Sequence, residues 1–198
     1  MGGEPPLPRR FGSVAVPQDA VSRDAWAWSA TQLPGYLFRH SVRSFCWGVL
    51  LAEQDALRFE PRILWVAALL HDVGLTRIGR SSRCFEYEGA EVARRFSLRA
   101  GLDAADADRI ARAIVLHMAP AVTLADGAES VLLDRATAVD VRHVDEDFVA
   151  DARAPIDEVL PRGDFDRRFR AAVAREVAIR TDCQSARLLP RLPAPARH

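Results

Sequence analysis

The chain has 198 residues, with 27 basic and 27 acidic side chains and therefore no formal net charge. Every basic residue except histidine is an arginine, which excludes lysine Schiff-base chemistry, and the balanced charge argues against a general nucleic-acid binder. Apolar residues make up 49 % of the chain, which is enough to bury the core of one globular domain.

Helical periodicity runs through most of the chain. The proline-rich ends, residues 1–17 and 187–198, are expected to be flexible and to flank one domain over residues 18–186. The apolar spacing predicts helices over residues 19–32, 37–56, 61–72, 87–100, 104–117 and 129–141, a polar loop over 75–85, and a further amphipathic helix from Phe165. No segment alternates at period two for long enough to predict a strand, so we expect an all-α fold.

The cysteines and the hydropathy indicate the compartment in which the protein is expected to act. Cys46, Cys84 and Cys183 are odd in number and lack CxxC spacing, so we expect neither a disulfide scaffold nor a zinc–cysteine site. No apolar stretch reaches the roughly 20 residues of a transmembrane helix, and no signal peptide is recognisable. We expect a cytoplasmic protein that acts on a small molecule, without nucleic-acid or membrane partners. A homo-oligomer is compatible with the sequence, which does not determine the oligomeric state.

Histidines and aspartates stand at unusual places in these helices. His40 lies on an apolar face of the central helix, His71 and Asp72 end the most apolar helix, and Asp140 ends another apolar run. Each alone is more often a core or capping residue. Together they are the ligands that Zn²⁺, Fe²⁺ or Mn²⁺ prefer, and a buried aspartate needs such a partner. Asp134, six residues earlier, is the rival for the distal position.

The ordered set His40, His71, Asp72 and Asp140 resembles the HD-domain metal-dependent hydrolase superfamily over residues 36–141. In that superfamily a helical bundle holds a metal ion between its helices through these four residues. The resemblance therefore implies an HD-type helical bundle and one bound divalent ion, with Zn²⁺ preferred and Fe²⁺ or Mn²⁺ as alternatives.

The flanking segments resemble the cyanamide hydratase-like branch of that superfamily. The matching stretches are residues 40–48, 70–76, 85–90, 113–117 and 136–140. Many HD phosphohydrolases carry a lysine shortly after the His-Asp pair, where this chain has leucine. The segment after Asp140 departs from the branch, which often continues with Asn and Gly, so another small nitrile-like substrate stays open.

This resemblance implies a hydratase that adds water to a small nitrile-like substrate, such as cyanamide to urea, through a metal-activated hydroxide. The implied acid–base and orienting groups are Asp72, His117 and Glu86. The residues expected to contact the substrate are Thr76, Arg43, Trp47 and Phe85, although a threonine here can instead cap a turn and such aromatic residues more often belong to the core. For His117 and Glu86 a purely structural role, as a helix-end histidine and a helix N-terminal carboxylate, is an equal alternative.

Two other functions remain open from the sequence. Arginines can bind phosphate through two parallel hydrogen bonds, so a phosphohydrolase acting on a nucleotide or phosphomonoester is the alternative. Its candidate phosphate-binding residues are Arg39, Arg43, Arg77 and Arg80. A degenerate or metal-bound binding module without catalysis is the third.

Overall fold

A computed structural model describes residues 6–77, 82–144 and 146–193 of the chain. The described part is mostly helical, which confirms the expected all-α class. Its longer helices are α1 (Ala20–Gln32), α2 (Gly35–Gln54), α3 (Pro61–Leu70), α4 (Phe85–Arg99), α5 (Ala104–Leu116), α6 (Ala128–Arg142), α7 (Glu146–Val159) and α8 (Phe165–Ile179). The short elements are strands β1 (Arg10–Phe11) and β2 (Val14–Ala15), helix α9 (Gln184–Leu188), and the 3₁₀ turns η1 (Val73–Arg77), η2 (Leu124–Asp126) and η3 (Leu189–Arg191). Among the described helices, none is long and apolar enough to cross a membrane.

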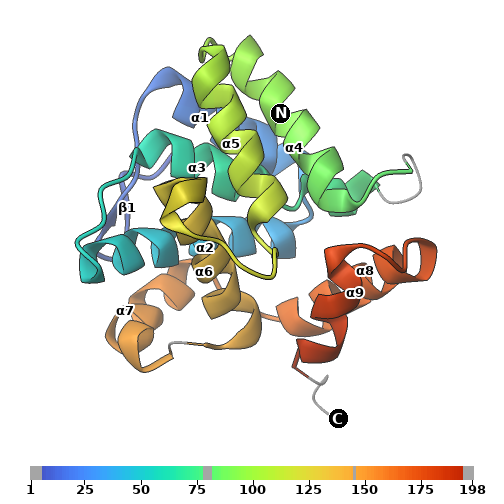
Figure 1. Cartoon of the computed structure of the whole chain (residues 1–198). Helices are drawn as coiled ribbons and strands as arrows, with labels where there is room; N and C mark the ends of the chain where they lie inside the picture. The colour runs from blue at the N-terminus through green and yellow to red at the C-terminus, as the bar shows by residue number, and fades with distance from the viewer. Residues whose placement is uncertain (1–5, 78–81, 145, 194–198) are drawn as a thin grey trace, which may run out of the picture.

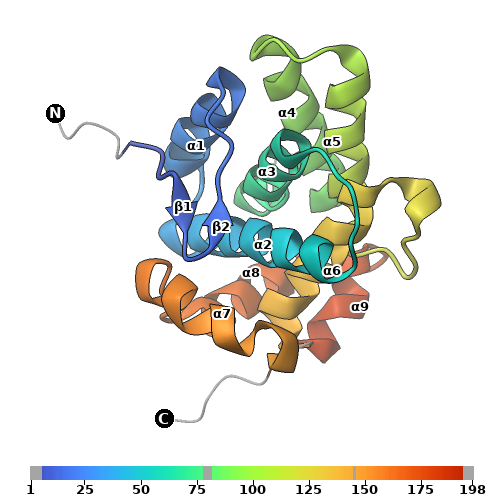
Figure 2. The same ribbon diagram turned by 90° about the vertical axis from the view of Figure 1, so that its left-hand side faces the viewer.

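Helix α2 is the central element of the fold. It runs across the middle of the molecule, with α1, α3, α4 and α5 on one side and α7 and α8 on the other (Figure 1, Figure 2). It packs against α3, α6 and α8, so it is covered on more than one face. This agrees with its sequence, in which apolar residues occupy two faces of the helix.

Helix α3 is the most deeply buried helix. Its residues from Ile63 to Leu70 are all fully buried, and Pro61 begins it at a position where the missing proline N–H costs nothing. Because the last turn of α3 lies in the core, the residues that follow it are placed in the core as well. His71 and Asp72 are therefore only 1 % exposed.

Within the described residues, parts of both proline-rich segments have regular structure. Residues 10–15, expected to belong to a flexible end, form a small antiparallel hairpin whose Phe11 and Val14 are buried against the core. At the other end, residues 184–191 are helical and Leu192 is buried. Proline is compatible with both structures because it occupies the first turn of η3 and the coil before β1.

A disulfide joins Cys84 to Cys183, and this corrects the expectation drawn from the cysteine count. The two cysteines are 99 residues apart, so no local spacing reveals the pair, and the odd residue is Cys46, a free thiol in the core. Disulfides persist in oxidising compartments. The cysteines therefore no longer support the expected cytoplasmic location.

Helix α7 was not predicted. It lies between the helix expected over residues 129–141 and the one expected from Phe165, and it contains Pro155. Val149, Ile156 and the following Leu160 are buried on one side at spacings of seven and four. The proline inside this segment argues against a helix when only the sequence is read, because proline in a helix interior removes a backbone hydrogen bond.

Gly74 sets the close approach between the turn after α3 and the beginning of α4. A Cβ atom at this position would lie 2.0 Å from the backbone oxygen of Phe85, which a side chain cannot tolerate. We expect Gly74→Ala to lower the free energy of unfolding by about 1–3 kcal/mol, because the overpacked backbone must move. Urea unfolding measures this.

Gly35→Ala is the matched control for that substitution. There the added methyl group meets only the flexible end of Arg39, at 3.2 Å, so the unfolding free energy should change much less. Equal losses in the two variants would contradict the role assigned to Gly74.

Candidate metal centre

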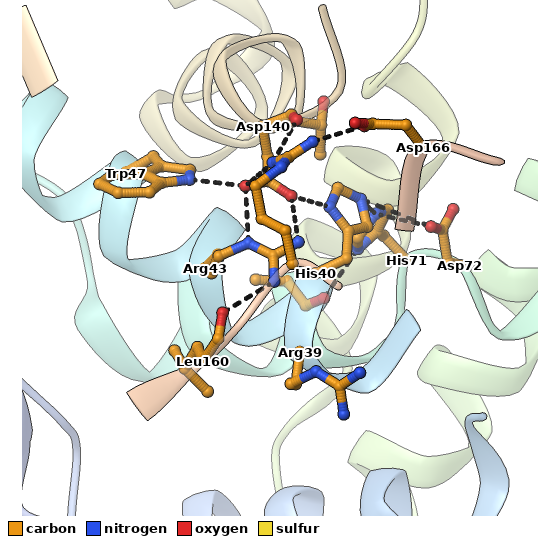
Figure 3. Close-up of polar contacts among 12 residues, drawn as sticks. Arg39, His40, Arg43, Trp47, His71, Asp72, Asp140, Leu160 and Asp166 are labelled. Atoms are coloured by element: carbon orange, nitrogen blue, oxygen red, sulfur yellow. Dashed lines mark hydrogen bonds and ion pairs between the residues drawn. The ribbon is translucent and has the colours of Figure 1, made fainter. Parts of the chain in front are cut away.

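Three buried side chains from two helices converge on one point. His40 comes from the middle of α2, and His71 and Asp72 follow the last residue of α3. The Nε2 atoms of the two histidines are 3.2 Å apart, and Oδ2 of Asp72 lies 3.3 Å from Nε2 of His71 and 3.5 Å from Nε2 of His40 (Figure 3). One ligand atom from each residue lies within 4.8 Å of the others, which is suitable for holding a metal ion.

The outer nitrogens of both histidines are already hydrogen-bonded. Nδ1 of His71 donates to the carbonyl oxygen of Ala68 at 2.7 Å, and Nδ1 of His40 lies 2.7 Å from Oδ2 of Asp140. In the neutral rings the proton is therefore held on Nδ1, and both Nε2 lone pairs face the same point. This outer hydrogen bonding is typical of metal-ligating histidine.

Asp72 gives the clearest sign that this point takes a cation. Both of its carboxylate oxygens are buried without a hydrogen-bond partner. Two imidazole lone pairs and a carboxylate without a hydrogen bond repel one another unless positive charge, a proton or a metal ion, lies between them. The three residues therefore fit a divalent metal ion by burial, ligand type and convergence.

The electrostatics of the group agree with this. Burial acts to raise the pKa of Asp72, but His71 and His40 overcome it and lower the pKa to about 2. Burial acts against the charged form of His71, yet the neighbouring Asp72 raises its pKa. The carboxylate thus favours positive charge at this point, whether a proton or a metal ion supplies it.

Asp140, expected as the fourth ligand, lies on the other side of His40. Arg43 donates to both of its oxygens, each at 2.8 Å, and Trp47 Nε1 donates at 3.0 Å (Figure 3). Arg162 adds a further contact at 3.1 Å. Burial opposes its charge, but Arg43 and His40 hold the pKa of Asp140 well below the usual range. In this geometry Asp140 orients His40 and is not among the three converging ligand atoms, so its expected place as the fourth ligand stays a prediction.

The expected substrate contacts are also placed differently. Arg43 and Trp47 are fully buried with Asp140, so they support the site from behind rather than facing a substrate. The hydroxyl of Thr76 donates to the carbonyl oxygen of Val73 at 2.7 Å. The ring of Phe85 packs edge-on against His117, with centroids 5.9 Å apart. None of these four is among the described residues that line the pocket at the site.

Glu86 is buried where α4 meets the C-terminal helices, and it is likewise absent from the described pocket lining. Burial raises the pKa of its carboxyl, while the backbone N–H of Gln184 opposes this shift. Next to it, the backbone N–H of Phe85 donates to Glu176 at 3.1 Å. Glu86 therefore lies in the first turn of α4, the position of the structural alternative, at the junction with the C-terminal helices.

His117 is brought to the site. It follows the last residue of α5, its ring centroid is 5.0 Å from that of His71, and it lines the pocket. Nδ1 donates to the carbonyl oxygen of Ile114 in a short hydrogen bond, so the neutral ring keeps its lone pair on Nε2. Burial, with His71 adding to it, lowers the pKa of His117 to about 4.

A pocket of about 270 Å³ opens over the cluster. His40, His71, Asp72 and His117 belong to its lining. The apolar part of the lining includes Met118, Pro120, Val141, Phe169 and Leu188. Its other polar residues are Asp134, Thr137, Arg142, Gln184, Arg187 and Arg191.

The three arginines in this lining differ from those expected to contact a substrate or a phosphate. Arg142 ends α6, and Arg187 and Arg191 belong to the end of the chain that was expected to be flexible. The sequence does carry a signal for a helix in this segment. The polar–apolar pair Arg187–Leu188 is repeated one helical turn later by Arg191–Leu192.

Asp134 lines this pocket, and burial raises its pKa to about 6 against the pull of Arg142 and Arg135. A carboxyl whose pKa is raised on folding stabilises the native state at low pH, and this contribution is lost as the pH rises from about 4 through 6. We expect Asp134→Asn to abolish this pH-dependent loss of stability, because asparagine does not titrate. The variant should gain about 1–3 kcal/mol of unfolding free energy relative to the parent chain between pH 5 and pH 8, measured by urea unfolding.

Asp24→Asn, on the exposed side of α1, controls for the removal of one negative charge. A pH-dependent gain of the same size in both variants would show that burial of Asp134 is not the cause.

The fold and this site define a helical protein with a histidine–aspartate metal centre. Residues 37–147 match the family model of the HD domain, which is more than half of the chain, and the protein therefore belongs to the HD domain family. Proteins of this family are in general metal-dependent hydrolases that bind divalent metal ions. This confirms the resemblance at the level of the superfamily. No curated protein gave a significant match to the chain.

Proposed function

We propose that the protein is a metal-dependent enzyme that adds water to a small nitrile-like substrate bound over His40, His71 and Asp72. The observation that carries this is the buried carboxylate of Asp72, which has no hydrogen bond and lies beside two histidine nitrogens at the bottom of a pocket. A divalent ion held there would polarise the substrate and lower the pKa of a bound water to about 7. Three protein ligands leave coordination positions open, which is typical of a catalytic site.

His117 supplies the proton-transfer group in this proposal. Its Nδ1 hydrogen bond to Ile114 fixes the ring, and the remaining nitrogen is a neutral acceptor beside the pocket. A positioned imidazole of this kind can take a proton from water and return it to the substrate nitrogen. Asp140, Arg43 and Trp47 hold His40 in place and take no part in the proton transfer.

The nitrile-like substrate is favoured by the likeness of the sequence to the cyanamide hydratase-like branch. The reaction is balanced without a further reactant: water adds across the C≡N bond, its oxygen to carbon and its two protons to nitrogen, so that cyanamide gives urea. The pocket volume of about 270 Å³ is many times the roughly 10–15 Å³ of cavity that holds one water, so it also admits nitriles with a larger substituent.

Urea formation from cyanamide by protein loaded with Zn²⁺, Fe²⁺ or Mn²⁺ tests this proposal. We expect His71→Ala and Asp72→Ala to lose both the metal ion, measured by elemental analysis, and urea formation. His143→Asn is the matched control, because it removes a histidine outside the cluster and asparagine tolerates the positive φ of 56° at that position. Protein that holds its metal ion and converts neither cyanamide nor other nitriles would contradict the proposal.

A phosphohydrolase is the second candidate, and the arginines that line the pocket favour it. Of the arginines that the sequence offers for this role, Arg43 is committed to Asp140 and Arg39 donates to the carbonyl oxygen of Pro161 at 2.8 Å. The side chains of Arg77 and Arg80 lie outside the described residues. Arg142, Arg187 and Arg191 take their place as cations beside the pocket. Release of inorganic phosphate from a panel of nucleotides and phosphomonoesters distinguishes this candidate.

A further inference from the structure

The C-terminal segment of the described chain presents one helical face to the pocket. Gln184, Arg187 and Leu188 of α9 and Arg191 of η3 all line it. Their spacing of three, four and seven residues is that of side chains on the same face of a helix. Two guanidinium groups therefore approach the pocket from a segment that lies outside residues 37–147, the part that matches the HD domain.

These two guanidinium groups differ from two other arginines near the site, Arg162 and Arg180. Arg162 pairs with Asp140 and Asp166, and Arg180 pairs with Glu176 at 2.7 Å. Within the described residues, neither Arg187 nor Arg191 has a hydrogen bond or an ion pair with an acidic side chain. Their positive charge is available to a molecule that enters the pocket.

The segment that carries them is held at both ends. Before it, Cys183 is bonded to Cys84 at the beginning of α4. After it, Leu192 is buried, and the guanidinium of Arg170 donates to the carbonyl oxygens of Leu189 and Leu192, each at 3.1 Å. Because the backbone is held in this way, less conformational entropy is lost when the arginines bind a ligand.

We propose that Arg187 and Arg191 form a recognition site for an anionic oxygen group of the substrate, a carboxylate or a phosphoryl group. The planar guanidinium donates two parallel hydrogen bonds to either group, which makes arginine the residue suited to both. The inference rests on the proposed function, because it takes the reacting part of the substrate to lie over His40, His71 and Asp72. It adds that the substrate is an anion whose charged end contacts the C-terminal segment.

Binding of inorganic phosphate and of acetate to the full chain, measured by isothermal titration calorimetry, tests the site directly. A metal ion would itself attract these anions, so the titrations are made with the Asp72→Ala protein as well as with the metal-loaded parent. We expect Arg187→Gln/Arg191→Gln to weaken anion binding at least tenfold in both backgrounds. Arg187→Lys/Arg191→Lys, which keeps the charge without the planar fork, should retain part of the affinity and shows that the segment is still folded.

Arg99→Gln is the matched control, since it removes an exposed arginine at the end of α4, outside the pocket lining. The preferred anion identifies the source of the charge: tighter binding of phosphate indicates a phosphoryl group, and tighter binding of acetate indicates a carboxylate. Unchanged affinity in Arg187→Gln/Arg191→Gln, or no binding of either anion to the parent chain, overturns the proposal.

A kinetic comparison separates this inference from the proposed function. The carboxylate-bearing nitrile cyanoacetate should have a lower KM than cyanoacetamide, its neutral analogue of similar size. The Arg187→Gln/Arg191→Gln variant should bind cyanoacetate more weakly, with a raised KM for that substrate alone. If neither nitrile is converted while anion binding still depends on the arginines, the nitrile reaction fails and the anion site stands. If both are converted with equal KM in all variants, the reaction stands and the anion site fails.

Discussion

Arg43→Met is expected to lower the free energy of unfolding by about 3–5 kcal/mol, because it leaves the buried carboxylate of Asp140 without its main counter-charge. Arg43 is fully buried and also donates to the carbonyl oxygen of Leu160 at 3.1 Å, so its loss removes the hydrogen bond to this carbonyl as well. The same change should weaken metal binding by about 10–100-fold, because Asp140 holds His40 in orientation. Urea unfolding and a competitive zinc titration measure the two effects.

Arg39→Met, one helical turn earlier and partly exposed, is the control and should have a small effect on both measurements. In the double variant Arg43→Met/Asp140→Asn the uncompensated charge is gone, so part of the lost stability should return. Strictly additive losses in the double variant would contradict a direct coupling between the two residues.

Removal of the disulfide should have an effect of similar size. The bond closes a loop of 99 residues, and a loop of this length restricts the unfolded chain strongly. We therefore expect Cys84→Ser/Cys183→Ser to be about 2–5 kcal/mol less stable than the oxidised parent protein in urea unfolding. Dithiothreitol should lower the stability of the parent chain to the same level and leave the double variant unchanged. An oxidised parent protein that is insensitive to reductant would show that the bond does not contribute.

Most of the helices and the burial of the His71–Asp72 pair were predictable because their signals are local. His71 and Asp72 follow a run of apolar residues, and that run alone indicates that the end of α3 lies in the core. The position of Asp140 was not predictable in the same way. Nothing next to it in sequence shows that its charge is neutralised from α2, 97 residues earlier.

A signal for that contact does exist on α2. Arg43 and Trp47 follow His40 by three and seven residues, so all three lie on one face of a helix that is apolar on two sides. A permanent cation on such a face requires a buried anion, and Asp140 is the buried aspartate that ends an apolar run. The disulfide left no comparable signal, because it depends on a contact between distant segments.

The disulfide also has a consequence for the order in which the molecule is assembled. Chains are synthesised from the N-terminus, and Cys183 follows every helix that contributes a metal ligand or supports one. Helices α2 to α6 can therefore fold and bring the histidines together before the bond is possible, and oxidation afterwards locks the C-terminal segment over a centre that already exists. A metal ion could enter the open centre first and become enclosed by the last step of maturation.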